Sequence, residues 1–458
     1  MAHSLSRGVV LSLLVLCLSL LGGDALFAQV SMEVLERIDI EPAHADNLIF
    51  GYVLVTDDND QFVAYYDAER NMTIAQRKLN EKTWSFHRLP CVLRNGENHC
   101  DLVMILDRDK YLHVSGNMHG HPLIYFRSEK PLDAASFVRV PQMVGQNESQ
   151  CTYPEFLNLA DGKLLFTYRD GSSGRGNQIW NLYDPDTKKW SRLHDTAILD
   201  GEGKMNPYMY GPIPGPDGWF HLTWCWRDTG DCRTNHDYSY ARSRDLKRWE
   251  TVRGEPLELP ISLARYPEAI VDPVPINSGL MNPNQRIGFD SKGRLVLSYG
   301  KYDTNGYYQV YNARFDGSDW MIRQASDWNY RWEFSGGGAV NLDIQFGPVE
   351  SQAGQLVQSF TRVNQGDGRL ILNEETLELV DSIPGPHPWP LEIDKLELDF
   401  PKLLSRTALD VRDRGKTFGQ DPKIRYILKW DMMPCNRDRP HDPPPPPTLL
   451  RIYKLQAP

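Results

Sequence analysis

Short apolar runs alternate with polar turns along most of this chain, and patterns with a helical period are nearly absent. A turn that contains Asp or Gly precedes an apolar run at residues 107–113, 161–168, 216–224 and 290–299. Runs of this kind, bounded by turn residues, are typical of β-strands. A second recurring piece is a strand followed by a polar turn and a tryptophan, as at residues 179–190 and 238–249. The pattern therefore predicts an all-β fold.

The spacing of the turns indicates a repeat. The turns at Asp107, Asp161, Asp217 and Asp290 follow one another at 54, 56 and 73 residues. A repeat of about four short strands is typical of a β-propeller, and about 430 residues hold roughly seven such units. We therefore expect a seven-bladed β-propeller that forms a single domain over residues 29–458.

The two ends of the chain are expected to meet. Residues 425–430 and 450–454 form apolar runs near the C-terminus, and residues 48–55 form one near the N-terminus. Pairing these segments would close the ring and remove two exposed sheet edges.

The first 28 residues predict export. A positively charged start is followed by an apolar run over residues 9–21 and by small residues, with cleavage expected after Ala25 or Ala28. This is the pattern of a secretory signal peptide, and the run is too short for a membrane span. No later segment is apolar enough to cross a bilayer, so we expect a secreted or periplasmic protein.

Charge and composition limit the classes of molecule that this protein is expected to bind. The formal net charge is −10 and basic runs are scarce, which argues against nucleic acid. The 12 Trp and 21 Tyr provide aromatic surface of the kind found in sugar-binding clefts, although most such residues in a β protein belong to the core. We expect a monomer with no organic cofactor.

Four of the 12 histidines fall within 23 residues, at positions 99, 113, 119 and 121. Side chains alternate between the two faces of a strand, so His119 and His121 can point the same way. If two strands lie side by side here, His99 and His119 share one end of a sheet. Histidine titrates close to neutral pH, so such a cluster suits proton transfer or metal binding. Structural, hydrogen-bonded histidines are the alternative.

A second group of polar residues suggests a metal site. His221, Cys225, Cys232 and His236 supply two thiolates and two imidazoles, which could hold a structural zinc ion across a propeller hairpin. The spacing is not that of a standard zinc finger. A disulfide between Cys225 and Cys232, or unpaired buried thiols, are the alternatives.

Longer motifs make the chain resemble a known family. They are Asn98-His99, residues 113–119, Tyr153-Pro154, residues 166–174, 200–203, 224–228, Asn235-His236, and residues 240–243, 332–338 and 436–440. With these motifs the chain is similar to the BNR-4 repeat family, whose members are exported and often called sialidase-like. The resemblance implies a seven-bladed propeller, and the family includes ulvan-type polysaccharide lyases.

The resemblance also implies a reaction and a site. In those lyases an acidic polysaccharide is cut by β-elimination: a base removes the C5 proton of a uronic acid, an acid protonates the leaving oxygen, and a positive group neutralises the carboxylate. The resemblance places a catalytic pair on His99 and His119, with Tyr168 as base or acid. Residues expected to bind substrate are Asn98, His121, Arg169, Arg175 and Arg286, and the choice among the three arginines for the carboxylate stays open. The alternative for Tyr168 is a core tyrosine.

Two other functions remain open. A glycoside hydrolase, sialidase-like or specific for a rhamnose–uronate linkage, would need a carboxylate pair, and Asp101, Glu155 and Asp170 are available. A sialidase usually carries an Arg-Ile-Pro motif in its first blade, and this sequence has none. A carbohydrate-binding propeller without catalysis is the other alternative.

Overall fold

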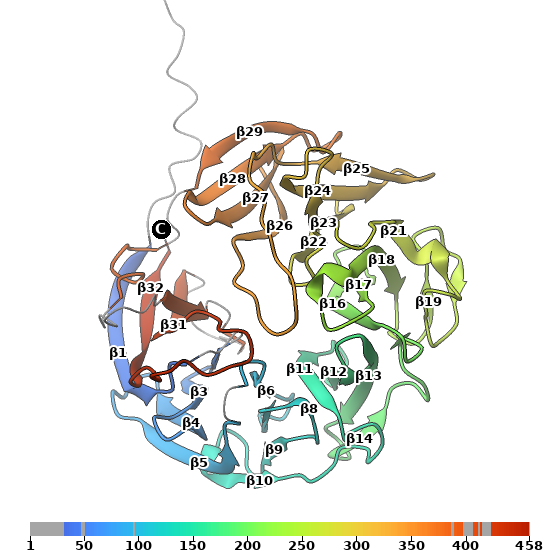
Figure 1. Ribbon diagram of the computed structural model, residues 1–458. Coiled ribbons are helices and arrows are strands. Elements are labelled where there is room, and N and C mark those ends of the chain that lie inside the picture. Colours follow the sequence, from blue (N-terminus) through green and yellow to red (C-terminus); the bar gives the residue numbers. More distant parts are fainter. Residues whose placement is uncertain are drawn as a thin grey trace, which may run out of the picture.

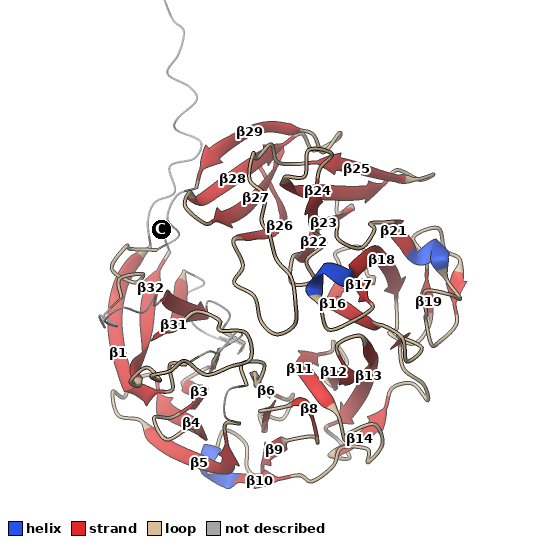
Figure 2. Ribbon diagram, viewed as in Figure 1, coloured by secondary structure: helices blue, strands red, loops and turns tan. Residues whose placement is uncertain are grey.

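The computed structural model describes residues 32–46, 51–94, 97–385, 389–396, 406–410, 413–414 and 423–457. The predicted signal peptide, residues 1–28, lies outside these residues. In the described residues the strands form seven antiparallel sheets, and the helical elements are three short 3-10 turns, at Ala134–Ser136, Cys232–Thr234 and Pro267–Ala269 (Figure 2). The prediction of an all-β fold is confirmed.

The seven sheets stand around a common centre (Figure 1), as a β-propeller requires. The first three in chain order are β2–β5 (Val53–Asp57, Asp60–Tyr66, Asn71–Lys78, Ser85–Val92), β6, β7, β9 and β10 (Leu102–Leu106, Leu112–Gly116, Tyr125–Ser128, Phe137–Arg139), and β8 with β11–β15 (His119–His121, Cys151–Asn158, Leu164–Ser172, Arg175–Asp184, Lys189–Arg192, Leu199–Asp200). The next three are β16–β21 (Asn206–Pro214, Phe220–Arg227, Asn235–Ser243, Trp249–Glu250, Pro256–Leu257, Ile270–Asp272), β22–β25 (Gln285–Phe289, Leu295–Tyr302, Tyr308–Phe315, Trp320–Gln324), and β26–β29 (Ile344–Gln352, Gln355–Arg362, Gly366–Leu372, Leu379–Pro384).

The seventh sheet closes the ring with both ends of the chain. It has the order β1-β32-β31-β30, with bounds Glu33–Ala43, Thr448–Gln456, Ile424–Met432 and Arg406–Asp410. β1 runs antiparallel to β32, from Glu33 opposite Gln456 to Ala43 opposite Thr448. The prediction that the two ends of the chain pair to close the ring is therefore confirmed. The N-terminal segment predicted for this pairing, residues 48–55, was wrong, because Val53–Val55 belong to β2 in the next sheet. All five β2 residues are buried, whereas exposed and partly buried residues alternate along much of β1, as on an outer edge strand.

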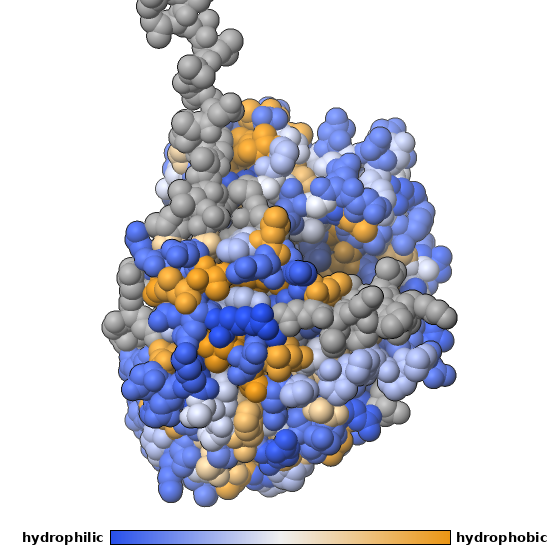
Figure 3. All heavy atoms as spheres, turned by 90° about the vertical axis from the view of Figure 1, so that its left-hand side faces the viewer, coloured by the Kyte–Doolittle hydropathy of each residue, from blue (hydrophilic) through white to orange (hydrophobic). Residues whose placement is uncertain are grey.

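The outer surface beside β1 and β32 mixes hydrophilic and hydrophobic residues (Figure 3). Exposed apolar side chains such as Leu35 on β1 are normal on a protein surface and need no partner to explain them. Within the described residues, no helix has both the length and the apolar character that a membrane crossing demands.

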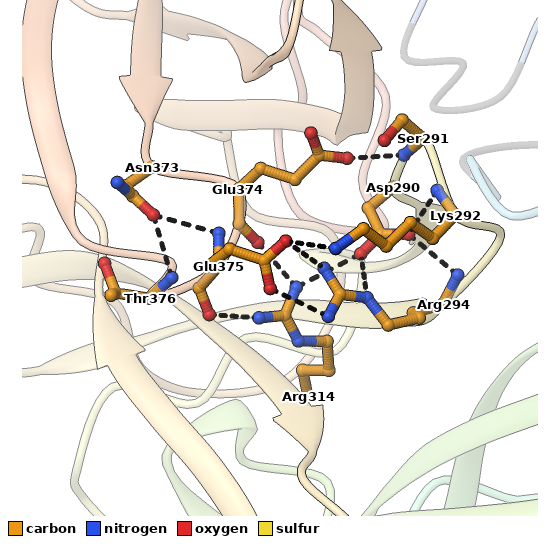
Figure 4. Close-up of polar contacts among 9 residues, drawn as sticks. All are labelled: Asp290, Ser291, Lys292, Arg294, Arg314, Asn373, Glu374, Glu375 and Thr376. Atoms are coloured by element: carbon orange, nitrogen blue, oxygen red, sulfur yellow. Dashed lines mark hydrogen bonds and ion pairs between the residues drawn. The ribbon is translucent and has the colours of Figure 1, made fainter.

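Adjacent blades are joined by ion pairs as well as by apolar packing. The turn between β22 and β23 meets the turn between β28 and β29, where Arg294 pairs with Glu375 and with Asp290 (Figure 4). Arg314 on β24 donates to the Asp290 carboxylate at 3.2 Å and to the backbone carbonyls of Glu374 and Glu375. The Asp290 side chain is completely buried, so these cations are what offset its charge.

Two long connections lie at the centre of the ring (Figure 1). One joins β25 to β26 and the other joins β31 to β32. They touch where the Asp438 carboxylate accepts a hydrogen bond from the Ala339 backbone, and where Asn341 bonds to the backbone of Cys435. The second connection thereby carries Asp438, from the C-terminal end of the chain, into the middle of the propeller.

Candidate active site

The site is assembled from four separate segments. Glu97 and His99 lie on the connection from β5 to β6, His119 begins β8, Tyr153 lies on β11, and Asp438 lies on the connection from β31 to β32. β8 pairs with β11, with His119 opposite Thr152, which brings Tyr153 beside the histidine. The β11 register shifts between Thr152 and Glu155, and Tyr153 has a φ of 55°. This conformation is costly for a bulky residue, and strained residues of this kind cluster at functional sites.

The two histidines form a stacked pair. Their ring centroids are 4.3 Å apart with an interplanar angle of 26°. The Tyr153 ring lies against both, with centroid distances of 5.8 Å to His99 and 6.3 Å to His119. The side chain of His99 is 9% exposed and that of His119 22% exposed, so His119 is the member that reaches solvent.

Carboxylates hold both histidines by the same ring nitrogen. Nδ1 of His99 lies 3.1 Å from Oε1 of Glu97 and 3.1 Å from Oδ1 of Asp438. Nδ1 of His119 lies 2.8 Å from Oε2 of Glu97. Glu97 therefore bridges the pair, and the Nε2 atom of each ring is left for other partners.

This arrangement gives the two histidines different protonation states. Burial by itself lowers the pKa of His99, but the Asp438 and Glu97 carboxylates outweigh it and raise that pKa to about 9. Burial lowers the pKa of His119 below its usual value, against the opposing effect of Glu97, and the charge on His99 adds to the lowering. At neutral pH the pair is thus one imidazolium, His99, and one neutral imidazole, His119.

Two arginines and a second tyrosine support Tyr153. The Arg169 guanidinium lies 4.9 Å from the centre of the Tyr153 ring, and its Nη1 donates to Oη of Tyr208 at 3.4 Å. Arg227 lies 4.2 Å from the Tyr208 ring centre and donates to the same oxygen at 3.1 Å. Burial raises the pKa of Tyr153, as does the neighbouring Tyr208. Burial acts on Tyr208 in the same direction, but Arg227 and Arg169 outweigh it and lower the pKa of Tyr208.

The predicted residues are only partly brought together. His99 and His119 form the expected pair, and the backbone of His119 donates to Nδ1 of His121 at 3.4 Å. Asn98 is fully buried, and its amide donates to the carbonyl of Arg437, so it anchors the segment that carries Asp438. His113 is a structural histidine, held at 2.7 Å from Tyr125 and 3.2 Å from Asp107.

The structure places Tyr168 outside this cluster. It packs in the core beside Phe166, and its hydroxyl accepts a hydrogen bond from Arg192 at 3.1 Å. Tyr153 occupies the position beside the histidines that we expected for Tyr168. Neighbouring residues on a strand face opposite ways, so Arg169 faces the site and Tyr168 does not.

The three predicted arginines lie in different places. Arg169 is part of the site but only 1% exposed, and its guanidinium contacts Tyr153, Tyr208 and Thr152. Arg175 is exposed at the β12–β13 turn, where its neighbour Ser173 bonds to Tyr208 at 2.8 Å. Arg286 on β22 donates to the backbone carbonyls of Pro283 and Gln285.

The predicted zinc ligands are not assembled. His221 bonds to Tyr240 and Asp217, and His236 lies between Asp237 and Asp228. His221 and Cys225 are four residues apart on β17, which separates them by about 13 Å at the usual strand rise. In the part of the chain that the structure describes, one group of three or more His, Cys, Asp or Glu residues has converging ligand atoms, and it is Glu97, His99, His119 and Asp438. Cys225 and Cys232 are buried free thiols rather than a disulfide.

The sequence analysis did not name five residues of this cluster as candidate site residues. They are Glu97, Tyr153, Tyr208, Arg227 and Asp438. Signals for three of them were present, because Tyr153-Pro154, residues 224–228 and residues 436–440 are among the motifs that carry the family resemblance. Glu97 lies two residues before His99, and no sequence pattern distinguished it from a surface acid.

Comparisons with known proteins agree with the fold. The model of the BNR repeat-containing family matches residues 60–328. A long-isoform ulvan lyase from Alteromonas sp is 27% identical over 124 residues, which cover 25% of this chain and 12% of that protein. A short-isoform ulvan lyase from Alteromonas sp. (strain LOR) is 30% identical over 125 residues, or 25% of this chain and 24% of the relative. The matched region thus spans less than a quarter of these curated relatives.

Solved structures resemble nearly the whole chain. The polysaccharide lyase Uly1 aligns with a TM-score of 0.59 and 13% identity, covering 93% of this chain and 100% of that one. A PL25 ulvan lyase bound to -[GlcA(1-4)Rha3S]- aligns with a TM-score of 0.54 and 12% identity, covering 92% and 96%. At such identities the likeness concerns the fold. The family model matches more than half of the residues of this chain, and the chain therefore belongs to the BNR repeat-containing family.

Proposed function

We propose that this protein is an exported polysaccharide lyase that cleaves a uronic-acid-containing polysaccharide by β-elimination. The observation that carries the proposal is the stacked pair of one charged and one neutral histidine beside Tyr153. β-Elimination needs a base, an acid and a positive group within reach of one sugar, and this cluster supplies all three. The similar ulvan lyases support the substrate class, since GlcA in one of their complexes is a uronic acid.

The neutral imidazole of His119 is suited to be the base. Its Nδ1 is held by Glu97, so the proton on Nδ1 points to the carboxylate and the lone pair is on Nε2. Nε2 takes the C5 proton of the uronic acid. The electron pair of that C–H bond forms the C4=C5 double bond as the C4–O bond breaks.

Tyr153 is suited to be the acid. Its raised pKa keeps the phenol protonated at neutral pH, so it can give its proton to the leaving oxygen. The imidazolium of His99 stabilises the negative charge that develops on the uronate carboxylate during proton removal. The proton gained by His119 and the proton lost by Tyr153 are then exchanged with water, which restores the site.

The proposal is tested by incubating the purified protein with a panel of uronic-acid polysaccharides that includes ulvan. Elimination creates a conjugated double bond that absorbs ultraviolet light, and hydrolysis does not. The expected result is a rise in absorbance together with new reducing ends. New reducing ends without the absorbance would indicate a glycoside hydrolase instead. Binding without either product would indicate a carbohydrate-binding propeller.

A further inference from the structure

The four side chains Glu97, His99, His119 and Asp438 converge on one point. One ligand atom from each lies within 4.8 Å of the other three. The contacts between imidazole and carboxylate are 3.1 Å, 3.1 Å and 2.8 Å, and all involve Nδ1 atoms. His99 presents its Nδ1 to both acids and His119 presents its Nδ1 to Glu97, so the four donors form one cluster instead of separate pairs.

The spacing of these donors is close to that of a metal tetrahedron. Zinc binds nitrogen and oxygen ligands at about 2.0–2.2 Å, which places neighbouring donors of a tetrahedral site about 3.3 Å apart. The three direct contacts, of 2.8–3.1 Å, are slightly shorter than this edge, and all four donor atoms lie within 4.8 Å of one another. A small outward movement of the carboxylates would therefore accommodate an ion, without refolding of the segments that carry them.

His236 shows that carboxylates around a histidine do not by themselves make such a site. Its Nδ1 is 2.8 Å from Asp237 and its Nε2 is 2.9 Å from Asp228, so the two acids lie on opposite sides of the ring. Donors on opposite sides of an imidazole cannot bind one ion. The convergence at the histidine pair is therefore a specific feature of that cluster.

The donor set also indicates the class of ion. Two imidazoles favour zinc and similar transition metals over magnesium or calcium, which prefer sites made entirely of oxygen. Two carboxylates balance the charge of a divalent ion. The partial exposure of His119 provides a path from solvent to the ligands.

We propose that Glu97, His99, His119 and Asp438 form a binding site for a divalent transition metal of the zinc class, and that occupation of this site stops elimination. The inhibition of elimination rests on the proposed function, and the binding of the metal does not. The ion takes the lone pair of Nδ1 on His119, so the proton of that neutral ring resides on Nε2. His99 binds through Nδ1 only after it has released its Nδ1 proton to water. Nε2 no longer has a lone pair for the C5 proton, so a bound metal and an active base exclude each other.

Metal binding is tested directly with Co²⁺, whose visible absorption reports tetrahedral coordination. The full chain is first treated with a chelator and then titrated with Co²⁺, and Zn²⁺ is added last as a competitor. We expect one tetrahedral Co²⁺ per chain that Zn²⁺ displaces. Asp438→Asn and Glu97→Gln keep the shape of the side chain and remove an anionic ligand. Each should therefore weaken binding by more than the roughly 10- to 100-fold lost when a residue that only supports a ligand is changed.

Two control variants separate this site from the other histidine and cysteine residues. His236→Gln and Cys225→Ser should leave the Co²⁺ spectrum unchanged. Loss of the spectrum in these variants, or its persistence in Asp438→Asn and Glu97→Gln, would place the metal elsewhere and overturn the proposal. Absence of any tetrahedral Co²⁺ signal in the unmodified chain would do the same.

The elimination assay with the chelated protein distinguishes the two proposals. If the chelated protein is active and loses this activity in step with the filling of the site by Co²⁺ or Zn²⁺, both halves of the inference hold. Activity that persists with the site filled by Zn²⁺ overturns the inhibition. If no polysaccharide is cleaved in the absence of metal but Co²⁺ binds as expected, the proposed lyase function fails and the metal site stands.

Discussion

The rings of His99 and His119 are stacked at 4.3 Å, yet Asp438 contacts only His99, while Glu97 contacts both. Two positive imidazolium ions in a stack would repel each other. The second carboxylate on His99 decides which ring holds the charge, and the neighbouring imidazolium helps to keep His119 neutral. Two chemically identical side chains therefore have two different protonation states at neutral pH.

This difference predicts a bell-shaped dependence of elimination on pH. Below its lowered pKa His119 is protonated and cannot act as a base, so kcat/KM should rise with pH in the region below about 6.5. Above about 9 His99 loses its positive charge, and the rate should fall. The measurement is the initial rate of double-bond formation across the pH range.

Asp438→Asn provides the matched control for that profile. Removing the carboxylate lowers the pKa of His99, so the fall of kcat/KM at alkaline pH should begin at a lower pH. The rise of kcat/KM at acidic pH should remain. A fall at alkaline pH that stays in place would mean that another group, such as Tyr153, sets it.

Tyr153→Phe should reduce kcat by about 10²- to 10⁴-fold, the usual contribution of a general acid. Phenylalanine keeps the ring that packs against the histidines and removes only the proton donor. Tyr168→Phe is the control, because that hydroxyl bonds to Arg192 in the core. It should retain activity and lose about 1 kcal/mol of stability. The reverse pattern would return the catalytic role to Tyr168.

The stability of the fold should also depend on His99. Its pKa is about 9 in the folded chain and about 6.5 when unfolded, so folding favours the protonated form. This contribution is fully present below about pH 6.5 and is lost as pH rises through about 9, and its full size is about 3 kcal/mol. His99→Gln should therefore destabilise the protein more at pH 6 than at pH 10, as measured by denaturant unfolding. An equal loss at both pH values would show that packing, not charge, explains the effect.

The ion-pair cluster where the β22–β25 sheet meets the β26–β29 sheet predicts a stability effect without a catalytic one. Asp290→Ala leaves Arg314 without its carboxylate partner in a buried position, which should cost about 3–5 kcal/mol. Glu375→Gln alters the exposed end of the same cluster and should cost less than about 1 kcal/mol (Figure 4). Thermal unfolding of both variants gives the comparison, and the activity of the folded protein at low temperature should be normal in each.

Local sequence patterns determined the architecture of this protein. Turn residues followed by alternating apolar runs specify strands, and their spacing specifies repeated sheets, because both depend on interactions between residues close in the chain. The pairing of His99 with His119 was predictable for a related reason, since both flank the strands of one short segment. The clustering of histidines is also visible without any knowledge of the fold.

The remainder of the site depends on contacts between distant segments. Asp438 reaches His99 across 339 positions of the chain, because the closing sheet and the central connections bring the C-terminal segment to the axis. The place of Tyr153 beside the histidines depends on a register shift in β11, and Tyr168 lies on the face of β12 opposite to Arg169. The predicted zinc ligands are near one another in sequence, but an extended strand holds His221 and Cys225 apart. Local spacing thus determines secondary structure, whereas the convergence of side chains on one point is decided by how the sheets close around the centre.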